Sequence, residues 1–260
     1  MPSKDLFNLE DRVAVVTGGS KGIGEQISLD LAGAGAHVAV VSRKLTEGEA
    51  VAQRIRQMGK KAEAIVADVR TPLEISAMVD QVLKKFQRID ILVNNAGTNI
   101  RKPATELLEE DWDAIIDTNL KGTFFCSQAV GKVMIRQGRG KIINIASIGG
   151  VIGMPWLGPY DASKAGIIQL TRVLALEWAK HNIRVNAIGP SYTRTPLTET
   201  WLGDPGRVAA IMSRHAIKRV GEMTDLTGVL LLLASDASDF ITGQTFFVDG
   251  GALAGWALEW

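Results

Sequence analysis

A tyrosine and a lysine stand four positions apart in the segment YDASK, residues 160–164, and a lone serine, Ser147, lies upstream of them. In a helix, positions i and i+4 share one face, so Tyr160 and Lys164 would point the same way. A free phenol has a pKa of about 10, and a nearby ammonium favours the phenolate, so such a pair can act as an acid or a base. The same spacing is common on exposed helices, so catalysis and a surface pair without function both stay open on this segment alone.

The composition is that of an ordinary globular protein. Of 260 residues, 46% are hydrophobic and 22% are charged, which is enough apolar material for a sizeable core. The net charge is +1, from 29 basic and 28 acidic residues without a long run of one sign. The charge balance therefore does not favour nucleic acid or a membrane surface as the main partner.

Metal binding and disulfides are not expected. Cys126 is the single cysteine and lies in an apolar stretch typical of a buried thiol. The three histidines, His37, His181 and His215, are far apart in the sequence. The N-terminus lacks an apolar signal core, and no window reaches the roughly 18 apolar residues of a membrane span. We expect a soluble, cytoplasmic protein without a metal.

Short apolar runs alternate with longer helix-like segments along the chain. The pattern predicts strands at 12–17, 37–41, 63–67, 89–94, 141–146, 183–188 and 244–248. It predicts helices near 22–34, 46–58, 72–86, 112–137, 160–180 and 224–234. Two helix starts are marked, by a capping box at 46–49 and by Thr71-Pro72. This alternation predicts an α/β protein, a parallel sheet between two layers of helices.

Residues 1–260 are expected to form a single domain, because no repeat or linker interrupts the alternation. Residues 190–223 break the rhythm before the last helix and strand, and they hold three prolines and several threonines. Ligands of open α/β sheets bind at the carboxyl ends of the strands, where this insertion would lie. We therefore predict a lid over the substrate.

A glycine-rich segment, TGGSKGIG at 17–24, connects the first predicted strand to the first predicted helix. Gly18, Gly22 and Gly24 would allow a tight turn and a close backbone approach. The helix that begins there offers free amides and a positive dipole end to a pyrophosphate. The position between strand and helix predicts a dinucleotide site, and the alternative is a turn that only packs helix against sheet.

The end of the second predicted strand indicates which dinucleotide binds. Sites for NAD usually place an acidic residue there, on the ribose 2′-hydroxyl. This chain has Ser42-Arg43-Lys44 instead. An arginine can pair with a 2′-phosphate, and Lys21 could add a second positive charge. The pattern favours NADP over NAD, unless Arg43 and Lys44 are merely solvated.

These motifs resemble the short-chain dehydrogenase/reductase family nearly end to end. The resemblance is carried by the glycine loop, Asp68, the segment NNAG at 94–97, and Asn119. Ser147, Tyr160 with Lys164, Pro190 and the closing segment ITGQTFFVDGG complete it. The family implies a Rossmann-type, doubly wound, parallel seven-stranded sheet in three layers. It also implies an oxidoreductase that transfers hydride between a nicotinamide cofactor and a carbonyl or alcohol.

The resemblance assigns catalytic roles to Asn119, Ser147, Tyr160 and Lys164. Tyr160 would be the general acid in reduction and the base in oxidation. Lys164 would lower the pKa of the phenol, together with the oxidised nicotinamide, and hold the ribose. Ser147 would orient the substrate oxygen. Asn119, at an expected helix distortion, would hold a water that links Lys164 to solvent.

The resemblance also implies the residues that bind the cofactor. They are Gly18, Ser20, Lys21, Gly22, Ile23, Gly24, Ser42, Arg43, Asp68, Val69, Asn95, Ala96, Gly97, Tyr160, Lys164, Pro190, Thr193 and Thr195. Asp68 and Val69 should meet the adenine, and Thr195 the nicotinamide side. This chain departs from the family at Pro190-Ser191, where Pro-Gly is usual, so the contacts to the carboxamide are less defined there.

The substrate is narrowed by segments that look most like gluconate 5-dehydrogenases. Arg101 could take a carboxylate bidentately, with Arg194 as a second candidate, unless Arg101 is a surface or intersubunit residue. The other expected substrate contacts are Gly149, Met154, Trp156 and Tyr192. Met154, Trp156 and Tyr192, with Leu157 and Trp201, are bulky and largely apolar and better suit an aryl or alkyl ketone.

Three functions follow from these observations. The first is an NADPH-linked reductase of a keto-sugar acid, and the second is a broad-range reductase of ketones and 3-oxoacyl thioesters. The third, a non-catalytic nucleotide sensor, predicts a broken catalytic set. The family also implies a homotetramer built from the long helices and last strands. Trp256 and Trp260 would then be buried at a subunit interface or reach a neighbour's pocket, or pack on their own subunit.

Overall fold

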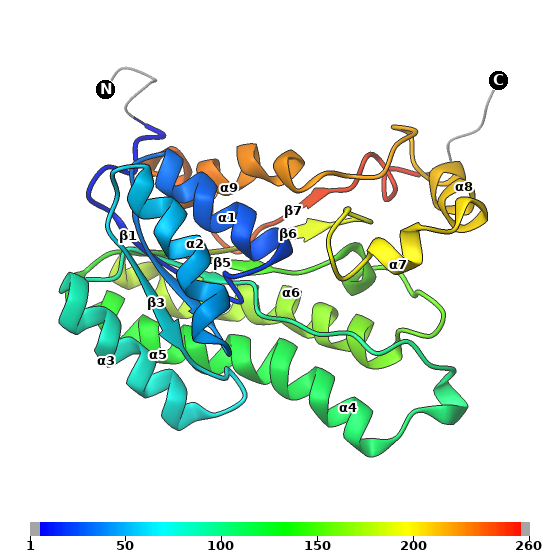
Figure 1. Ribbon diagram of the computed structural model, residues 1–260, viewed down its shortest axis with the longest axis horizontal. Helices are drawn as coiled ribbons and strands as arrows, with labels where there is room; N and C mark the ends of the chain where they lie inside the picture. Colours follow the sequence, from blue (N-terminus) through cyan, green and yellow to red (C-terminus); the bar gives the residue numbers. More distant parts are fainter. Residues whose placement is uncertain (1–5, 256–260) are drawn as a thin grey trace.

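A parallel sheet of seven strands forms the centre of the computed structural model, which describes residues 6–255 (Figure 1). The strand order is β3-β2-β1-β4-β5-β6-β7, and every neighbouring pair is parallel. In chain order the strands are Val13–Thr17, His37–Ser42, Ala62–Val66, Ile91–Asn94, Gly140–Ile145, Ile183–Pro190 and Thr245–Val248. The predicted doubly wound α/β fold is confirmed, because the strand order reverses on either side of β1.

Helices cover both faces of this sheet (Figure 1). One layer consists of α1 (Gly22–Gly33), α2 (Leu45–Gln57) and α9 (Thr227–Ala234). The other consists of α3 (Pro72–Phe86), α5 (Gly122–Gln137) and α6 (Gly158–Trp178). Helix α4 (Glu109–Ile116) leads into α5. Among residues 6–255, no helix combines the length and apolar character that a membrane span requires.

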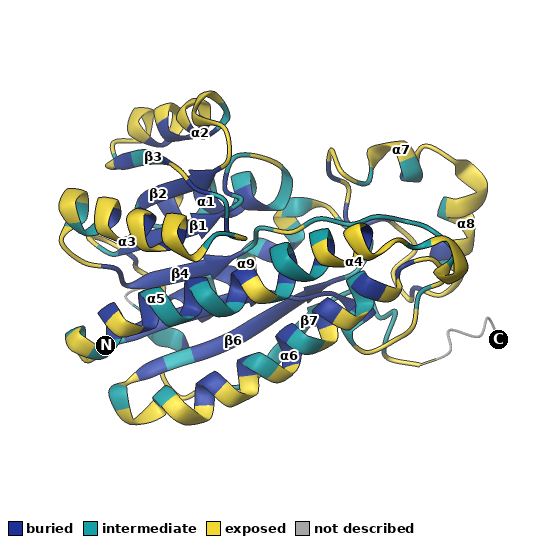
Figure 2. Ribbon diagram, turned by 90° about the horizontal axis from the view of Figure 1, so that it is seen from below, coloured by how far each residue is buried: buried dark blue, intermediate teal, exposed yellow. Residues whose placement is uncertain are grey.

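The alternation of strand side chains supplies both halves of the core. In β1, Ala14 and Val16 pack with α1, α2 and α9, whereas Val13 and Val15 pack toward α3, α5 and α6. Because both faces are covered, the strands are mostly apolar, with a few polar positions such as Lys141 and Asn144 in β5. Figure 2 shows the result, with buried strands between helices that are exposed only on their outer sides.

The predicted helix 112–137 is interrupted. A π-helical turn, Asp117–Lys121, joins α4 to α5 and carries Asn119. The expected helix distortion at Asn119 is therefore confirmed. A π turn adds a residue to the helical repeat and re-aims the side chains around it, which is why such turns recur at functional sites.

Of the two predicted helix starts, the structure confirms one and contradicts the other. Helix α3 begins as predicted, with Thr71 as its N-cap and Pro72 as its first residue. The predicted capping box at 46–49 is wrong. Helix α2 already begins at Leu45 after the extended Lys44, so Thr46 lies inside the first turn, where its side chain cannot cap the helix.

The predicted insertion contains two short helices that the sequence pattern missed, α7 (Glu199–Leu202) and α8 (Pro205–Ser213). Asp204 caps α8, since its Oδ1 accepts from the backbone N of Gly206 at 2.8 Å and of Arg207 at 3.2 Å. Leu202, Ile211 and Val220 form a small separate core beneath them. In Figure 1 both helices lie beyond the carboxyl end of β6, where the sheet opens.

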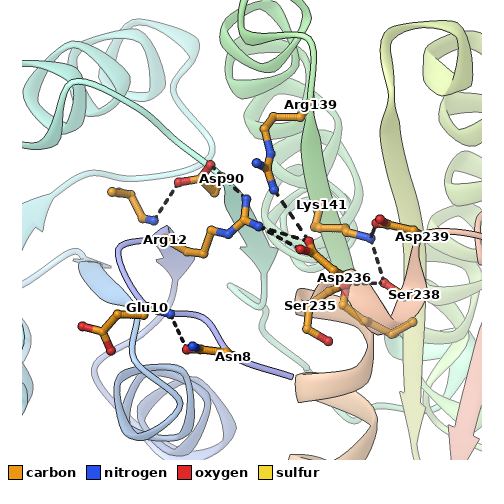
Figure 3. A network of polar contacts seen from close by, with 12 residues as sticks. Asn8, Glu10, Arg12, Asp90, Arg139, Lys141, Ser235, Asp236, Ser238 and Asp239 are labelled. Atoms are coloured by element: carbon orange, nitrogen blue, oxygen red, sulfur yellow. Dashed lines mark hydrogen bonds and ion pairs between the residues drawn. The ribbon is translucent and has the colours of Figure 1, made fainter. Parts of the chain in front are cut away.

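Charged residues gather at the opposite, amino end of the strands (Figure 3). Arg12 precedes β1 and reaches Asp236 at 3.1 Å, and Asp90 precedes β4 and accepts from the backbone N of Val13 at 2.9 Å. Lys141 in β5 pairs with Asp239 at 2.7 Å. This network joins three strands to the segment between α9 and β7.

Candidate active site

The glycine loop forms a bed of open backbone amides. Gly18 (φ +63°) and Gly22 (φ +55°) adopt the left-handed conformation that favours glycine. A Cβ at Gly18 would lie only 2.9 Å from the Cα of Ala96, so the loop needs its glycine for close packing as well. The N-cap residue of α1, Lys21, makes no side-chain capping bond, so the first amides of the helix stay available to an anion.

One large cleft of about 1250 Å³ opens at the carboxyl ends of the strands. It exceeds a typical small-ligand pocket, so there is room for a dinucleotide with a substrate beside it. Most predicted site residues line it: Gly18, Ser20, Lys21, Gly22, Ile23, Ser42, Arg43, Asp68, Val69, Asn95, Ala96, Gly97, Arg101, Ser147, Met154, Tyr160, Lys164, Pro190, Tyr192, Thr193 and Thr195. The predicted pocket-edge residues Leu157 and Trp201 line it as well, and so do unpredicted residues, among them Arg70, Asn99, Thr200 and Arg207.

Four predicted residues do not line the cleft. Gly24 packs α1 against the loop, because a Cβ there would meet the carbonyl oxygen of Gly18 at 2.1 Å. Gly149 is buried beneath Asp161 and Met154. Trp156 is 59% exposed and belongs to the surface of its loop. For Gly149 and Trp156 the structure gives no place beside a substrate, which corrects the prediction.

Asn119, the fourth, is fully buried and serves as a brace. Its Nδ2 donates to the carbonyl oxygen of Thr98 at 3.0 Å and to Ser163 Oγ at 3.1 Å, while its Oδ1 accepts from the Thr98 backbone N at 2.8 Å. The side chain therefore ties the loop after β4 to helix α6. Its backbone oxygen accepts from Thr123 Oγ1 at 2.6 Å.

The pair Tyr160 and Lys164 lies on the inner face of α6, beside the end of β5. Lys164 is 5% exposed, and its Nζ lies 5.5 Å from the centre of the Tyr160 ring. The ammonium donates to the carbonyl oxygen of Ile145 at 2.7 Å. Burial lowers the pKa of Lys164 to about 8, because a charged ammonium is costly away from water.

The pKa of Tyr160 responds mainly to burial. Burial raises the pKa of this phenol, and a hydrogen bond with Ser147 lowers it in part. Burial is the largest cause of this shift. That Lys164, together with the oxidised nicotinamide, lowers the pKa of the phenol stays a prediction, and the ammonium is placed for it 5.5 Å from the ring centre. Ser147 and Tyr160 line the same cleft, and Ser147 Oγ accepts from the backbone N of Gly149 at 3.1 Å.

Around the glycine loop and the end of β2, most basic residues form ion pairs and one does not. Lys21 lies 2.8 Å and Lys44 3.4 Å from the same carboxylate oxygen of Glu47. Asp68 is held by Arg70 at 2.6 Å, and this hydrogen bond lowers the pKa of the carboxyl. Arg43 is exposed and forms no ion pair within residues 6–255. Arg43 is thus the basic group here that remains open to a ligand.

The departure at Ser191 has a structural counterpart. Ser191 Oγ lies 2.7 Å from His215 Nε2, and His215 Nδ1 lies 2.8 Å from the carbonyl oxygen of Ile211. A carbonyl oxygen only accepts, so Nδ1 carries the proton and Ser191 donates to Nε2. The buried His215 therefore ties the end of β6 to helix α8.

Aromatic side chains form the wall of the cleft on the side of the insertion. The rings of Tyr192 and Trp201 stack with centroids 5.1 Å apart, and the guanidinium of Arg101 lies 4.5 Å from the Trp201 ring centre. Tyr192 also donates to Met154 Sδ at 3.5 Å. Arg194, the other predicted carboxylate anchor, lies within 3.7 Å of Glu199 and Glu222 and is outside the cleft.

Comparison with known proteins gives the family. Residues 18–252 match a family described as enoyl-(acyl carrier protein) reductase. The chain is 44% identical over 249 residues to a 2-dehydro-3-deoxy-D-gluconate 5-dehydrogenase of Escherichia coli K12, which covers 95% of this chain and 98% of that protein. The protein belongs to the short-chain dehydrogenase/reductase family. The predicted family and the oxidoreductase class are thereby confirmed.

Two further relatives show the range within this family. A 3-oxoacyl-[acyl-carrier-protein] reductase of Synechocystis is 40% identical over 245 residues, covering 94% of this chain and 97% of the relative. A gluconate 5-dehydrogenase of Burkholderia cenocepacia J2315, solved in complex with NADP and tartrate, is 37% identical with a TM-score of 0.95. That match covers 97% of this chain and 99% of the other. The family thus contains both predicted substrate classes.

Proposed function

We propose that this dehydrogenase/reductase transfers hydride between NADP(H) and a keto-sugar acid. The observation that carries the proposal is one continuous cleft with three features. It joins open backbone amides at Gly18, the phenol of Tyr160 with Ser147 and Lys164 in the same cleft, and the guanidinium of Arg101, which has no ion pair within residues 6–255. Each feature serves one part of the reaction, namely the cofactor phosphates, the reacting oxygen and the substrate carboxylate.

The residues at the glycine loop and at Arg43 fit NADP. When bound, NADPH supplies the hydride that reduces the substrate carbonyl. The amides at the start of α1 would bind the pyrophosphate, and the unpaired guanidinium of Arg43 would bind the 2′-phosphate. The gluconate 5-dehydrogenase of B. cenocepacia was solved with NADP, which supports this choice.

Proton transfer would use the phenol of Tyr160. In reduction, Tyr160 gives its proton to the carbonyl oxygen, and the Ser147 hydroxyl donates a hydrogen bond to the same oxygen. The raised pKa of the buried phenol keeps it protonated, as an acid requires. Lys164, close to the phenol, holds the ribose and stabilises the phenolate left behind. Asn119 braces the loop and the helix between which a water linking Lys164 to solvent would run.

Arg101 makes an acid the preferred substrate. No ion pair within residues 6–255 engages its guanidinium, and its charge lowers the pKa of Tyr160. Relatives that act on sugar acids support this substrate, including a 5-keto-D-gluconate 5-reductase of Escherichia coli at 37% identity. The second candidate is a reductase of ketones or 3-oxoacyl thioesters, favoured by the apolar wall of Tyr192, Trp201 and Met154.

NADPH oxidation by the purified protein decides between the two substrates. We expect 5-keto-gluconate to be reduced with a kcat/KM at least tenfold above an aryl ketone and a 3-oxoacyl thioester. Arg101→Gln should raise the KM for the keto acid about tenfold, since a charge-assisted bidentate pair is lost. Arg194→Gln serves as the matched control and should leave it unchanged. A preference for the aryl ketone or thioester would overturn the assignment.

Cofactor choice is tested separately at Arg43. Arg43→Asp removes the guanidinium and repels a 2′-phosphate, so the ratio of kcat/KM for NADPH over NADH should fall by about a hundredfold. Lys44→Gln is the neighbouring control, because Lys44 is already paired with Glu47. An unchanged ratio in Arg43→Asp would show that another group reads the 2′-phosphate.

We further propose a cytoplasmic homotetramer in which residues 190–223 form the lid. The outer side of α6 exposes Val173 and Leu176, and Phe240 before β7 is fully exposed. Apolar side chains grouped in this way favour contact with another copy of the chain. Trp256 and Trp260 lie outside the described residues. An unchanged tetramer with unchanged KM values after deletion of residues 254–260 would remove the predicted role of these tryptophans.

A further inference from the structure

Two guanidinium groups approach the same indole ring at the mouth of the cleft. Arg101, in the loop after β4, lies 4.5 Å from the ring centre of Trp201, and Arg207, on helix α8, lies 5.8 Å from it. Both arginines and the tryptophan line the cleft. Two cations from distant segments of the chain therefore contact one indole ring through cation–π interactions.

The two arginines differ in how firmly they are engaged. Arg101 is part of no ion pair within residues 6–255. Arg207 lies 3.4 Å from Asp204, but both side chains are about half exposed, so solvent weakens this pair. The same carboxylate also caps α8 through its other oxygen. The guanidinium of Arg207 can therefore leave Asp204 without disturbing the start of the helix.

Arg101 is also the link between this mouth and the reacting centre. Its charge is close enough to lower the pKa of both Tyr160 and Asp161. Trp201 and Arg207 line the same cleft from the insertion. A substrate whose carbonyl meets Tyr160 would therefore share the cleft with two arginines, one from the loop after β4 and one from the insertion.

We propose that Arg207 joins Arg101 to form a two-guanidinium site for the substrate carboxylate, so that the anion itself holds the lid closed. This inference rests on the proposed function. Without an anion the two like charges repel each other, whereas a carboxylate has two oxygens and can accept from both forks. Closure would then depend on the charge of the substrate and would keep water from the reacting carbon.

A variant of the lid arginine tests the proposal against a matched control. Arg207→Gln should raise the KM for 5-keto-gluconate about tenfold, while the KM for the uncharged amide of the same acid changes less than twofold. The kcat for the acid should stay within twofold, because Arg207 would bind the carboxylate and take no part in the proton transfer. Arg214→Gln is the control, since Arg214 is exposed at the end of the same helix and outside the cleft.

Either of two results would overturn this site. In one, Arg207→Gln raises the KM of the acid and of its amide equally, which would indicate a packing role beside Trp201. In the other, it leaves both unchanged. Arg207→Lys keeps the charge but loses the planar fork, so it should recover only part of the affinity for the acid.

A binding measurement separates this inference from the proposed function. Tartrate serves as the probe, titrated by calorimetry into the protein with NADP, for wild type, Arg207→Gln and Arg214→Gln. Binding weakened about tenfold in Arg207→Gln alone supports the site, even if wild type fails to reduce the keto acid. Turnover of the keto acid with identical tartrate affinities in all three proteins would retain the function and refute the site.

Discussion

The two ends of the sheet treat charge in opposite ways. At the amino end, Arg12 lies 3.1 Å from Asp236 and 4.0 Å from Asp90 (Figure 3). Arg88 also binds Asp90, at 2.6 Å. Lys141 is paired with Asp239, and its Nζ donates to Ser238 Oγ at 3.0 Å. Burial lowers the pKa of this ammonium. Buried charges there are compensated by the chain itself.

At the carboxyl end the chain pairs some cations, such as Lys21 with Glu47, and leaves others without a carboxylate. Lys164 is buried with a carbonyl oxygen as its partner, and Arg43 and Arg101 have no carboxylate within residues 6–255. An uncompensated charge costs stability unless another molecule completes it. The charges at the amino end of the sheet therefore serve stability, whereas those at the carboxyl end are arranged for ligands.

The largest effect should come from the reacting phenol. Tyr160→Phe removes the only proton that this side chain can give to the substrate, so kcat should fall by about 10³-fold. The melting temperature and the NADPH affinity, followed by cofactor fluorescence, should stay close to wild type. A variant that keeps most of its turnover would refute the proton-transfer role and, with it, the functional character of the carboxyl end.

The amino end should respond in stability and not in turnover. Asp90→Ala leaves Arg88 and the backbone N of Val13 without their acceptor and removes the carboxylate 4.0 Å from Arg12, so the free energy of unfolding should fall by about 3 kcal/mol. Asp236→Ala, at a half-exposed partner, should cost about 1 kcal/mol. Urea denaturation gives both values. Two results would contradict the assignment of stability to the amino end and of ligand binding to the carboxyl end. One is an equal loss of unfolding free energy in both variants, and the other is a lowered kcat in the protein that remains folded.

Lys164 should make activity and stability follow pH in opposite directions. In the native state its pKa is about 8, whereas an unfolded lysine titrates near 10.4, so the unfolded chain binds more protons between these values. Stability contributed by this group therefore rises over that interval, and the burial penalty is fully present below it. The kcat/KM for reduction should fall above pH 8, where the ammonium is lost.

Comparison with Lys164→Met isolates this titration. The variant should lose most of its turnover but no stability at pH 7, because an apolar side chain replaces a buried cation. Its unfolding free energy should also lack the rise between pH 8 and 10.4. A wild-type kcat/KM that stays level from pH 7 to 10 would show that the ammonium is not needed.

The smallest effect is expected at Ser191, which lines the cleft and also bonds His215. Ser191→Gly restores the residue usual in the family and removes the bond to His215, so helix α8 loses one tie to β6. The KM for NADPH should rise two- to threefold with kcat unchanged. Val208→Ala, a nearby change on α8 without this bond, is the control. A lowered kcat in Ser191→Gly would place Ser191 in the chemistry instead.

The elements that are regular along the chain could be predicted closely. All seven strands lie within two residues of their predicted bounds, because buried parallel strands are continuous β-branched runs. The short helices α7 and α8 were missed, since four and nine residues show little periodicity. A signal for α8 was present in Asp204-Pro205, an N-cap followed by proline.

The residues themselves determined the reaction class and most of the cleft. Gly18, Gly22, Tyr160 and Lys164 act at fixed local spacings that a strand-turn-helix or a single helical face must preserve, so the sequence reveals them. Tertiary structure alone decided which charges are left uncompensated. Arg101 and Arg207 both contact Trp201, and Lys21 forms an ion pair with Glu47, because folding joins segments far apart in the chain. Spacing along a sequence cannot report such pairings, since they depend on how the sheet brings its loops to one edge.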